Sequence, residues 1–508
     1  MSILKKLASD TAYYGLSSIV GRVLNYLLFP FYTAIFFAKD YGIMSDFYAK
    51  AALFNVLYLY GMETAYFRFA TKKEGNPQAI FQTTFTAILL TSLLFSALLI
   101  LFSQSLANLM QYPDRQIDVI LFALLFGVDA VAAIPFARLR QENKAKKFAF
   151  IKIANILINI FFNVFFLYFC QNVLINEGGL GFFEMFASLR PWIAQIYHPE
   201  YALTYVFAIN LIANLLQIIF LKETFKNFQF QIEKEKLKEM FFYAYPLLFT
   251  GLAGAVNEVI DRDLLKYWLP ENFYPNKTNL DAVGIYSACY KLSIFISLAT
   301  QAFRYAGEPF FFAKAQDKNS PILFAKVMHY FIIALIFMYL AVSVNLDVLQ
   351  HMMRKEEYRE GLYIVPFLLL ANLFLGVYYN LTVWFKVTDK THYSLIFSGI
   401  GALITIVGNL ILIPIWGYMG SAVVTLLCYF FMCVFCYIYG QKYFPIPYNL
   451  KSAFGYIGLA SGLIYITYQF DLENIVFNFI FHNFLILVFL GIVFILEREN
   501  LRQPTKKV

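Results

Sequence analysis

Charge is scarce in this sequence. Only 14% of the 508 residues are Asp, Glu, Lys or Arg, whereas 60% are hydrophobic. A soluble protein of this length presents a charged and polar surface to water on all sides, so the composition excludes an ordinary soluble globular protein. The composition predicts a chain that resides in a membrane.

Cysteine and histidine are also rare, with five residues of each type. The C-x-x-C pair Cys433 and Cys436 has no second ligand pair near it, so we expect both to fill space within an apolar helix. The histidines are scattered singly, and the chain lacks a G-x-x-x-x-G-K-[ST] loop, which excludes nucleotide hydrolysis by that route. We therefore expect no metal site, no cofactor, no catalytic residue and no enzymatic activity.

Apolar stretches of about 20 residues recur from end to end, and a helix of that length crosses a bilayer core of about 30 Å. The sequence predicts an all-α polytopic membrane protein with about 14 transmembrane helices. We expect no cleavable signal peptide, because the first apolar stretch contains Arg22 and Asn25 and lacks a small-residue cleavage site. The predicted spans are 10–37, 43–69, 80–104, 117–137, 149–170, 201–221, 241–266, 282–312, 322–346, 361–385, 393–415, 418–440, 452–469 and 475–496.

The placement of Lys and Arg predicts how the chain is oriented. With the N-terminus in the cytoplasm, the inside segments hold 27 of the 40 Lys and Arg residues, the outside segments hold 9, and 4 lie within spans. Cytoplasmic loops carry such an excess of positive charge. We predict that both termini and the 222–240 loop are cytoplasmic and that the 171–200 loop is outside. The same bias explains the net charge of +8 without a nucleic-acid partner.

A weak internal repeat divides the chain. The pattern G-I-x-S-x-x-Y begins at Gly42 and again at Gly284, and Asn163 and Asn409 repeat at nearly the same offset. Transporters are often built from duplicated halves, which supports two parallel six-helix bundles followed by two extra helices. The predicted organisation is 1–221 for the N-terminal bundle, 222–240 for a cytoplasmic linker, 241–440 for the C-terminal bundle, and 441–508 for two additional helices and a tail.

Ionisable residues within the predicted spans mark a candidate transport site, because a charge at mid-membrane is costly unless it faces a cavity or a partner. All but Asp129 fall in the repeat-equivalent spans 1, 2, 7 and 8, which points to one polar cavity between the halves. A structural role stays open for several of them, since Glu258 and Arg262 are spaced to neutralise each other on one helix face and Asp261 could reach lipid headgroups. The set is Arg22, Glu63, Asp129, Glu258, Asp261, Arg262, Lys291, Arg304 and Glu308.

Asparagines 155, 159 and 163 share one face of the fifth predicted span. This spacing favours hydrogen bonds between helices over a role in ligand binding.

Four stretches carry a resemblance to a known family. The chain resembles the Wzx-like polysaccharide flippases of the multidrug/oligosaccharidyl-lipid/polysaccharide exporter superfamily. The likeness extends over nearly the whole chain in loose patterns. The stretches are Asp10–Gly15 with Phe29–Thr33, Tyr245–Leu247 with Asp261–Arg262, Val283–Ala288 with Tyr290–Leu292, and Asp389–Thr391 with Ile413–Ala422.

The resemblance implies two six-helix bundles in a bacterial cytoplasmic (inner) membrane that move an undecaprenyl-diphosphate-linked oligosaccharide by alternating access. It implies that cavity cations hold the diphosphate, and Arg22, Arg262, Lys291 and Arg304 fit that role by position. Carboxylates are about as numerous as these cations, which leaves room for coupling to H⁺ or Na⁺ through Glu63, Glu258 or Asp261. The partners expected are therefore the lipid-linked oligosaccharide, membrane lipids and a coupling cation.

Two other functions are weighed against flipping. A cation-coupled multidrug exporter of the same superfamily would also use carboxylates such as Glu63 and Glu258. A membrane glycosyltransferase or polymerase would need a catalytic carboxylate or base in a sizeable loop. The largest predicted outer loop, 171–200, contains Glu177, Glu184 and His198 without a recognisable catalytic arrangement.

Overall fold

The structure of the protein is a computed structural model. It describes residues 20–502 with the exception of Arg22, Asn25, 72–75, 176–181, 315–316, 318, 389 and 471–474. The predicted diphosphate ligand Arg22 therefore lies outside the described residues.

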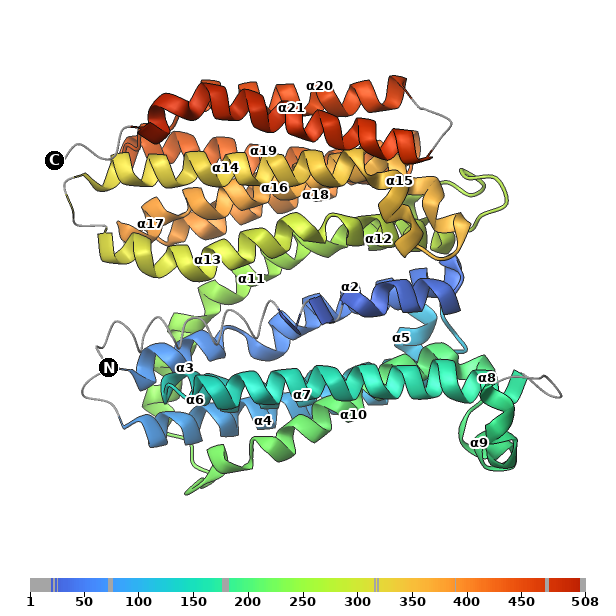
Figure 1. Cartoon of the computed structure of the whole chain (residues 1–508). Helices are drawn as coiled ribbons and strands as arrows, with labels where there is room; N and C mark the ends of the chain where they lie inside the picture. Colours follow the sequence, from blue (N-terminus) through green and yellow to red (C-terminus); the bar gives the residue numbers. More distant parts are fainter. Residues whose placement is uncertain are drawn as a thin grey trace. The chain divides into compact units, whose positions relative to one another are not determined.

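Every regular element in the described part of the chain is a helix, which confirms the predicted all-α class (Figure 1). The α-helices of the first part are α2 (Ala38–Leu59), α3 (Met62–Ala70), α4 (Pro77–Leu101), α5 (Ser103–Leu109), α6 (Gln116–Gln141), α7 (Ala145–Val164), α8 (Gln171–Ile175), α9 (Arg190–Ile196), α10 (Ala202–Phe220) and α11 (Lys234–Trp268). Those of the second part are α12 (Asn279–Leu292), α13 (Ile294–Lys314), α14 (Ser320–Val344), α15 (Leu346–Leu349), α16 (Val365–Leu381), α17 (Val383–Val387), α18 (His392–Trp416), α19 (Tyr418–Tyr443), α20 (Leu450–Gln469) and α21 (Ile475–Arg502).

Ten helices in the described residues are long and apolar enough to cross a membrane. An eleventh span results if α12 and the start of α13, which meet at a bend of 47°, count as one. The predicted count of 14 is not confirmed. Segments 43–69 and 452–469 are helical, but they do not reach the hydropathy of the ten. The described part of span 10–37 contains the short apolar helix Tyr26–Ile35.

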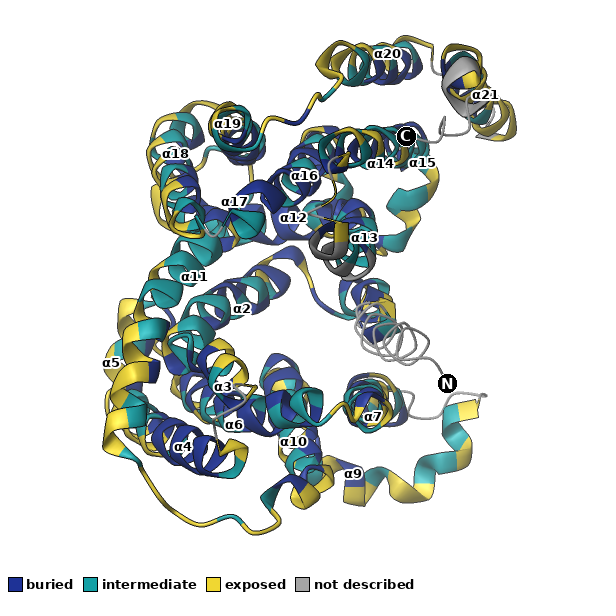
Figure 2. Cartoon of the chain, turned by 90° about the vertical axis from the view of Figure 1, so that its left-hand side faces the viewer, coloured by how far each residue is buried: buried dark blue, intermediate teal, exposed yellow. Residues whose placement is uncertain are grey.

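Several of these helices bury little of their apolar surface within the chain. Only 28% of the most apolar window of Val476–Arg498, within α21, and 33% of that of α18 are buried. Both helices carry exposed stretches in Figure 2. Apolar side chains exposed over a whole helix face are expected where the solvent is lipid rather than water.

The chain forms two compact units. The first comprises the described residues up to Leu28 together with Asp46–Val259, and the second comprises Phe29–Ser45 with the residues from Ile260 onward. One unit boundary lies between Leu28 and Phe29, and the other two fall inside α2 and inside α11. The halves 1–221 and 241–440 are predicted from the sequence repeat rather than from compactness, and they remain a prediction.

Aromatic rings fill the core of the first unit between α2, α6 and α10. The ring centroids of Phe122 and Phe207 are 4.7 Å apart, and Phe47 lies 5.2 Å from Phe122 and 5.3 Å from Phe207. Aromatic pairs at these distances stabilise a core beyond the area they bury. The buried Asp46 carboxylate accepts a hydrogen bond of 2.8 Å from Tyr112 and pairs with Lys50, so its charge is compensated.

The second unit contains a close approach of two helix backbones. A Cβ atom added to Gly42 in α2 would lie 2.1 Å from the carbonyl oxygen of Leu280 in α12, and one added to Gly284 would lie 1.9 Å from the carbonyl oxygen of Ala38. Glycine is therefore required at both positions, as at other interfaces where small residues let helices approach closely. These two glycines are the first residues of the repeated G-I-x-S-x-x-Y pattern, so the pattern marks a packing site.

The C-terminal helices dock onto α14 through a buried polar cluster. Glu497 of α21 accepts a hydrogen bond of 2.7 Å from the Tyr456 hydroxyl of α20, and its carboxylate also contacts the His329 ring of α14 at 2.8 Å. Glu497 is 4% exposed. A carboxylate buried this deeply is tolerated because polar neighbours satisfy it, and these contacts tie α20 and α21 to α14.

Candidate functional site

Glu63 is placed by a break between α2 and α3. Gly61 adopts a positive φ of 79°, and a Cβ there would lie 2.6 Å from the carbonyl oxygen of Ala244, so the turn needs glycine. The break begins α3 one residue later and puts Glu63 in its first turn. There Glu63 forms an ion pair with Arg140 from the last turn of α6, and both side chains are about one-third exposed.

A chain of polar contacts continues from this ion pair into the first unit. Lys152 of α7 lies near enough to both Glu63 and Asp129 to interact with their charges. The Asp129 carboxylate accepts a hydrogen bond of 2.6 Å from the Asn214 amide, and Asn155 donates to Asn214 at 2.8 Å. Helices α3, α6, α7 and α10 thus share one network containing two acids and two bases.

The network reaches α2 through a tyrosine. The Asn210 amide, one turn before Asn214 in α10, donates a hydrogen bond of 3.1 Å to the Tyr48 hydroxyl. Tyr48 also interacts electrostatically with Asp129. A buried carboxylate can bind a proton, or serve as an oxygen ligand to a small cation. Here the positive charge of Lys152 opposes both, so either ion would have to compete with that lysine for Asp129.

Outside the spans, Glu142 links the end of α6 to the following loop. Its carboxylate contacts Arg138 at 2.7 Å and Lys144 at 2.7 Å. Burial raises the pKa of Glu142, but the hydrogen bonds and charges of Lys144 and Arg138 outweigh it, so the pKa lies below its ordinary value. Arg138 also donates to the Gln78 side chain at 2.8 Å, which ties the start of α4 to this charged end of α6.

In the second unit, Asp261 and Arg262 form one charged group with two tyrosines. The Tyr286 hydroxyl donates to Asp261, and the Arg262 guanidinium donates to the same carboxylate at 2.9 Å. The Arg262 guanidinium lies 4.7 Å from the centre of the Tyr290 ring, a cation–π distance. Asp261 is only 2% exposed, so it is an interior partner of Arg262 rather than a headgroup anchor.

Arg304 lies on α13, beyond the 47° bend at Ser293 that the sequence did not reveal. Its guanidinium lies 4.2 Å from the centre of the Tyr379 ring of α16. Lys291 is exposed in the last turn of α12, on the other side of the bend. Glu258 is exposed on α11 in the first unit, and Arg262 forms an ion pair with Asp261.

Sequence reasoning missed part of the polar network. Arg140 and Lys152 are among the 27 Lys and Arg residues that the orientation count assigns to the cytoplasmic side, and Asp129 lies outside the four paired spans, so the sequence gives no reason to join them. The asparagines gave a usable signal, since Asn155 bonds to Asn214 on another helix as predicted, whereas Asn163 bonds to Asn159 on its own helix at 2.8 Å. Asn210 and Asn214 carry the same i, i+4 spacing in the sixth span.

All five cysteines are buried as free thiols, and Cys433 and Cys436 pack within α19 as space-filling residues. Among the described residues, no group of three or more His, Cys, Asp or Glu side chains is arranged to hold a metal ion.

Solved structures with the same arrangement of helices define the class. The structure of the lipid II flippase MurJ in an inward closed conformation aligns with a TM-score of 0.72 at 12% identity, over 96% of this chain and 99% of that chain. An outward-facing multidrug-resistance MATE family transporter of the MOP superfamily aligns with a TM-score of 0.57 at 12% identity, over 87% and 98%. An inward-facing MATE family transporter of the same superfamily aligns with a TM-score of 0.56 at 13% identity, over 87% of this chain and 94% of that chain. The chain thus has the fold of multi-pass membrane transporters and flippases.

The family follows from the sequence match. Residues 7–312 match the family described as Polysaccharide biosynthesis protein, and the chain belongs to that family. The predicted resemblance is confirmed. The family and the structural neighbours are flippases and transporters rather than enzymes. No curated protein matches the chain.

Proposed function

We propose that the protein translocates an undecaprenyl-diphosphate-linked oligosaccharide, a precursor of cell-surface polysaccharide, across the bacterial cytoplasmic membrane by alternating access. Membership of the polysaccharide biosynthesis family carries this proposal. The likeness to a lipid II flippase over nearly the whole chain supports a lipid-linked sugar as the cargo. Both termini are placed in the cytoplasm by the charge bias.

The diphosphate is assigned to Arg22, Arg262, Lys291 and Arg304. Arginine suits diphosphate because its planar fork donates paired hydrogen bonds and stays charged in an apolar setting. Arg262 and Arg304 each lie against a tyrosine ring, which supports the assignment because packing on the ring face orients the planar guanidinium.

The test of this assignment is surface glycan in a deletion strain complemented with single variants. Arg262→Ala and Arg304→Ala should each abolish glycan with the protein still present in the membrane, and Arg304→Lys should restore only part of it because lysine lacks the fork. Arg190→Ala is the matched control, since Arg190 pairs with Glu184 beside α9. Wild-type glycan from both alanine variants would remove these arginines from the site.

Coupling to a cation, H⁺ or Na⁺, is assigned to Glu63, Glu258 and Asp261, to which the polar network adds Asp129. Glu63 and Asp129 support this assignment, because the charge of Lys152 interacts with both carboxylates. Protonation of one carboxylate would therefore change how strongly Lys152 interacts with the other.

The second candidate function is a cation-coupled multidrug exporter of the same superfamily. The MATE transporters among the structural neighbours favour it, together with the Asp129 network. Loss of drug resistance with unchanged surface glycan in a deletion strain would select this function over the first.

A further inference from the structure

An apolar groove runs along the first unit between α2, α4 and the start of α11. Its volume is about 940 Å³, at the upper end of the range of small-molecule sites. Several lining side chains are exposed, with Leu57 at 38%, Leu90 at 54%, Leu98 at 44% and Phe241 at 52%. The groove is therefore open along its length, and most of its lining side chains are apolar.

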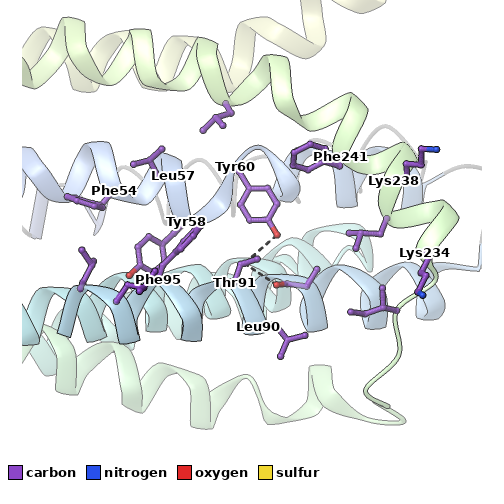
Figure 3. A pocket seen from close by; sticks show the side chains of 16 residues that line it. Phe54, Leu57, Tyr58, Tyr60, Leu90, Thr91, Phe95, Lys234, Lys238 and Phe241 are labelled. Carbon is purple, nitrogen blue, oxygen red and sulfur yellow. Dashed lines mark hydrogen bonds between the residues drawn. The ribbon is translucent and has the colours of Figure 1, made fainter. Parts of the chain in front are cut away.

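The charge of the groove is confined to the beginning of α11. Lys234 and Lys238 are one helical turn apart, and both line the groove (Figure 3). Among the described residues, neither forms an ion pair, whereas Lys236 between them contacts Glu233 at 2.8 Å. Asp and Glu are absent from the groove lining in the described part of the chain. The site thus combines a doubly positive group with a long apolar wall.

The remaining polar groups of the lining are already engaged. The Tyr60 hydroxyl lies 3.4 Å from the Thr91 hydroxyl, and Thr91 also donates to the Ala87 carbonyl at 3.0 Å (Figure 3). The Tyr58 hydroxyl lies 3.1 Å from that of Ser96. These contacts leave little hydrogen-bonding capacity for a sugar.

The groove has the length of one bilayer leaflet. Its α4 residues run from Ala87 to Leu99, about 18 Å along a helix, and half of a bilayer core is about 15 Å. The beginnings of α4 and α11 lie at the same level, because the backbone N–H of Glu233 donates to the Thr83 hydroxyl at 3.1 Å. The lysines therefore lie where the apolar part of α4 begins.

We propose that this groove binds an anionic phospholipid of the surrounding bilayer, distinct from the transported cargo. Lys234 and Lys238 bind the phosphate, and an acyl chain lies along Leu90, Phe95 and Leu98. Lysines at a membrane surface attract anionic lipids, and the apolar wall adds the burial of the chain. A diphosphate-linked oligosaccharide fits less well, because its sugars would meet hydroxyls that are already hydrogen-bonded to one another.

The experiment measures lipid binding to the full-length protein by native mass spectrometry. Phosphatidylglycerol and phosphatidylcholine with identical acyl chains are titrated into delipidated protein. Phosphatidylglycerol should bind at least about tenfold more tightly, and K234Q/K238Q should weaken its binding about 30-fold, the effect expected for two surface lysines. The matched control K236Q removes the same charge from the same helix and should change binding less than about twofold.

A second pair of variants tests the apolar wall independently of the lysines. Leu90→Trp fills the groove and should displace the lipid, whereas Leu94→Trp on the same helix lies outside the lining and should leave binding unchanged. Equal binding of the two phospholipids, or unchanged phosphatidylglycerol binding in both K234Q/K238Q and Leu90→Trp, would overturn the proposal. Displacement of phosphatidylglycerol by a lower concentration of undecaprenyl diphosphate would also overturn it, because the groove would then belong to the cargo.

Discussion

Replacing Gly42 with alanine tests the packing of α2 on α12. The new methyl group would lie 2.1 Å from the Leu280 carbonyl oxygen and 3.1 Å from the Gly284 nitrogen, against a comfortable carbon contact of about 3.5–4.0 Å. Both neighbours are backbone atoms, so rotating a side chain cannot relieve the clash. The helices must separate by more than about 1 Å, and overpacking of this kind costs about 1–3 kcal/mol.

Gly254 supplies the matched control. It lies within α11, and a Cβ there would meet no atom within 4 Å. Alanine at an open helical position is worth about 0.5–1 kcal/mol of stability relative to glycine. We expect Gly42→Ala to lower the free energy of unfolding and Gly254→Ala to raise it, so that the two variants differ by about 1.5–4 kcal/mol.

The assay is the half-life of purified full-length protein at a fixed elevated temperature, followed by loss of helical circular dichroism. A rate is the proper measure because membrane proteins of this size unfold irreversibly. About 2 kcal/mol corresponds to a half-life about 30-fold shorter for Gly42→Ala if the contact is lost before the transition state. A Gly42→Ala half-life equal to or longer than that of Gly254→Ala would refute the close approach.

The remaining predictions concern the ion pair, the coupling network and the orientation. Glu63→Arg should lower surface glycan, and the reversed pair Glu63→Arg with Arg140→Glu should restore at least part of it, whereas no recovery would mean that the pairing is incidental. Asp129→Asn should insert normally but lose the dependence of transport on an imposed H⁺ or Na⁺ gradient in vesicles, and retained gradient dependence would make Asp129 structural. A cysteine in place of Lys234 should resist an impermeant thiol reagent in intact cells while one in place of Glu200 reacts, and the reverse labelling would invert the orientation.

The fold was predictable because hydropathy is local. Each stretch of about 20 apolar residues predicts a transmembrane helix independently of the rest of the sequence. The structure has helices at these stretches throughout the described chain. The glycine repeat was also visible, although its meaning was not. A repeated G-I-x-S-x-x-Y pattern does not disclose that Gly42 and Gly284 face each other, since that depends on how α2 and α12 are rotated.

The site was less predictable for the same reason. An ion pair depends on the rotation and depth of two helices, which the hydropathy of either helix does not contain. Sequence spacing predicts Glu258 as a partner of Arg262, but it does not reveal the ion pair of Arg262 with the adjacent Asp261, whose carboxylate accepts a hydrogen bond from Tyr286. Glu63 likewise pairs with Arg140, a residue far along the chain at the end of another helix.

The bend at Ser293 could not be predicted from the sequence for a different reason. No proline lies close to Ser293, so the sequence predicts one continuous helix there, whereas the structure turns by 47° between α12 and α13. The Ser293 hydroxyl accepts a hydrogen bond of 3.0 Å from Asn372 of α16, so a contact with a distant helix accompanies the bend. Tertiary contacts of this kind are absent from any local pattern.

The most direct test of the proposed function is flipping by the purified protein in vesicles. An undecaprenyl-diphosphate-linked oligosaccharide with a fluorescent sugar is incorporated into both leaflets, and an impermeant reductant reports the fraction exposed outside. The full-length protein should make nearly all of the label accessible within minutes, while Arg304→Ala and protein-free vesicles should leave about half of it protected. Protection of half of the label by the natural protein, together with gradient-driven transport of a small cationic drug in the same vesicles, would contradict the flippase and establish an exporter.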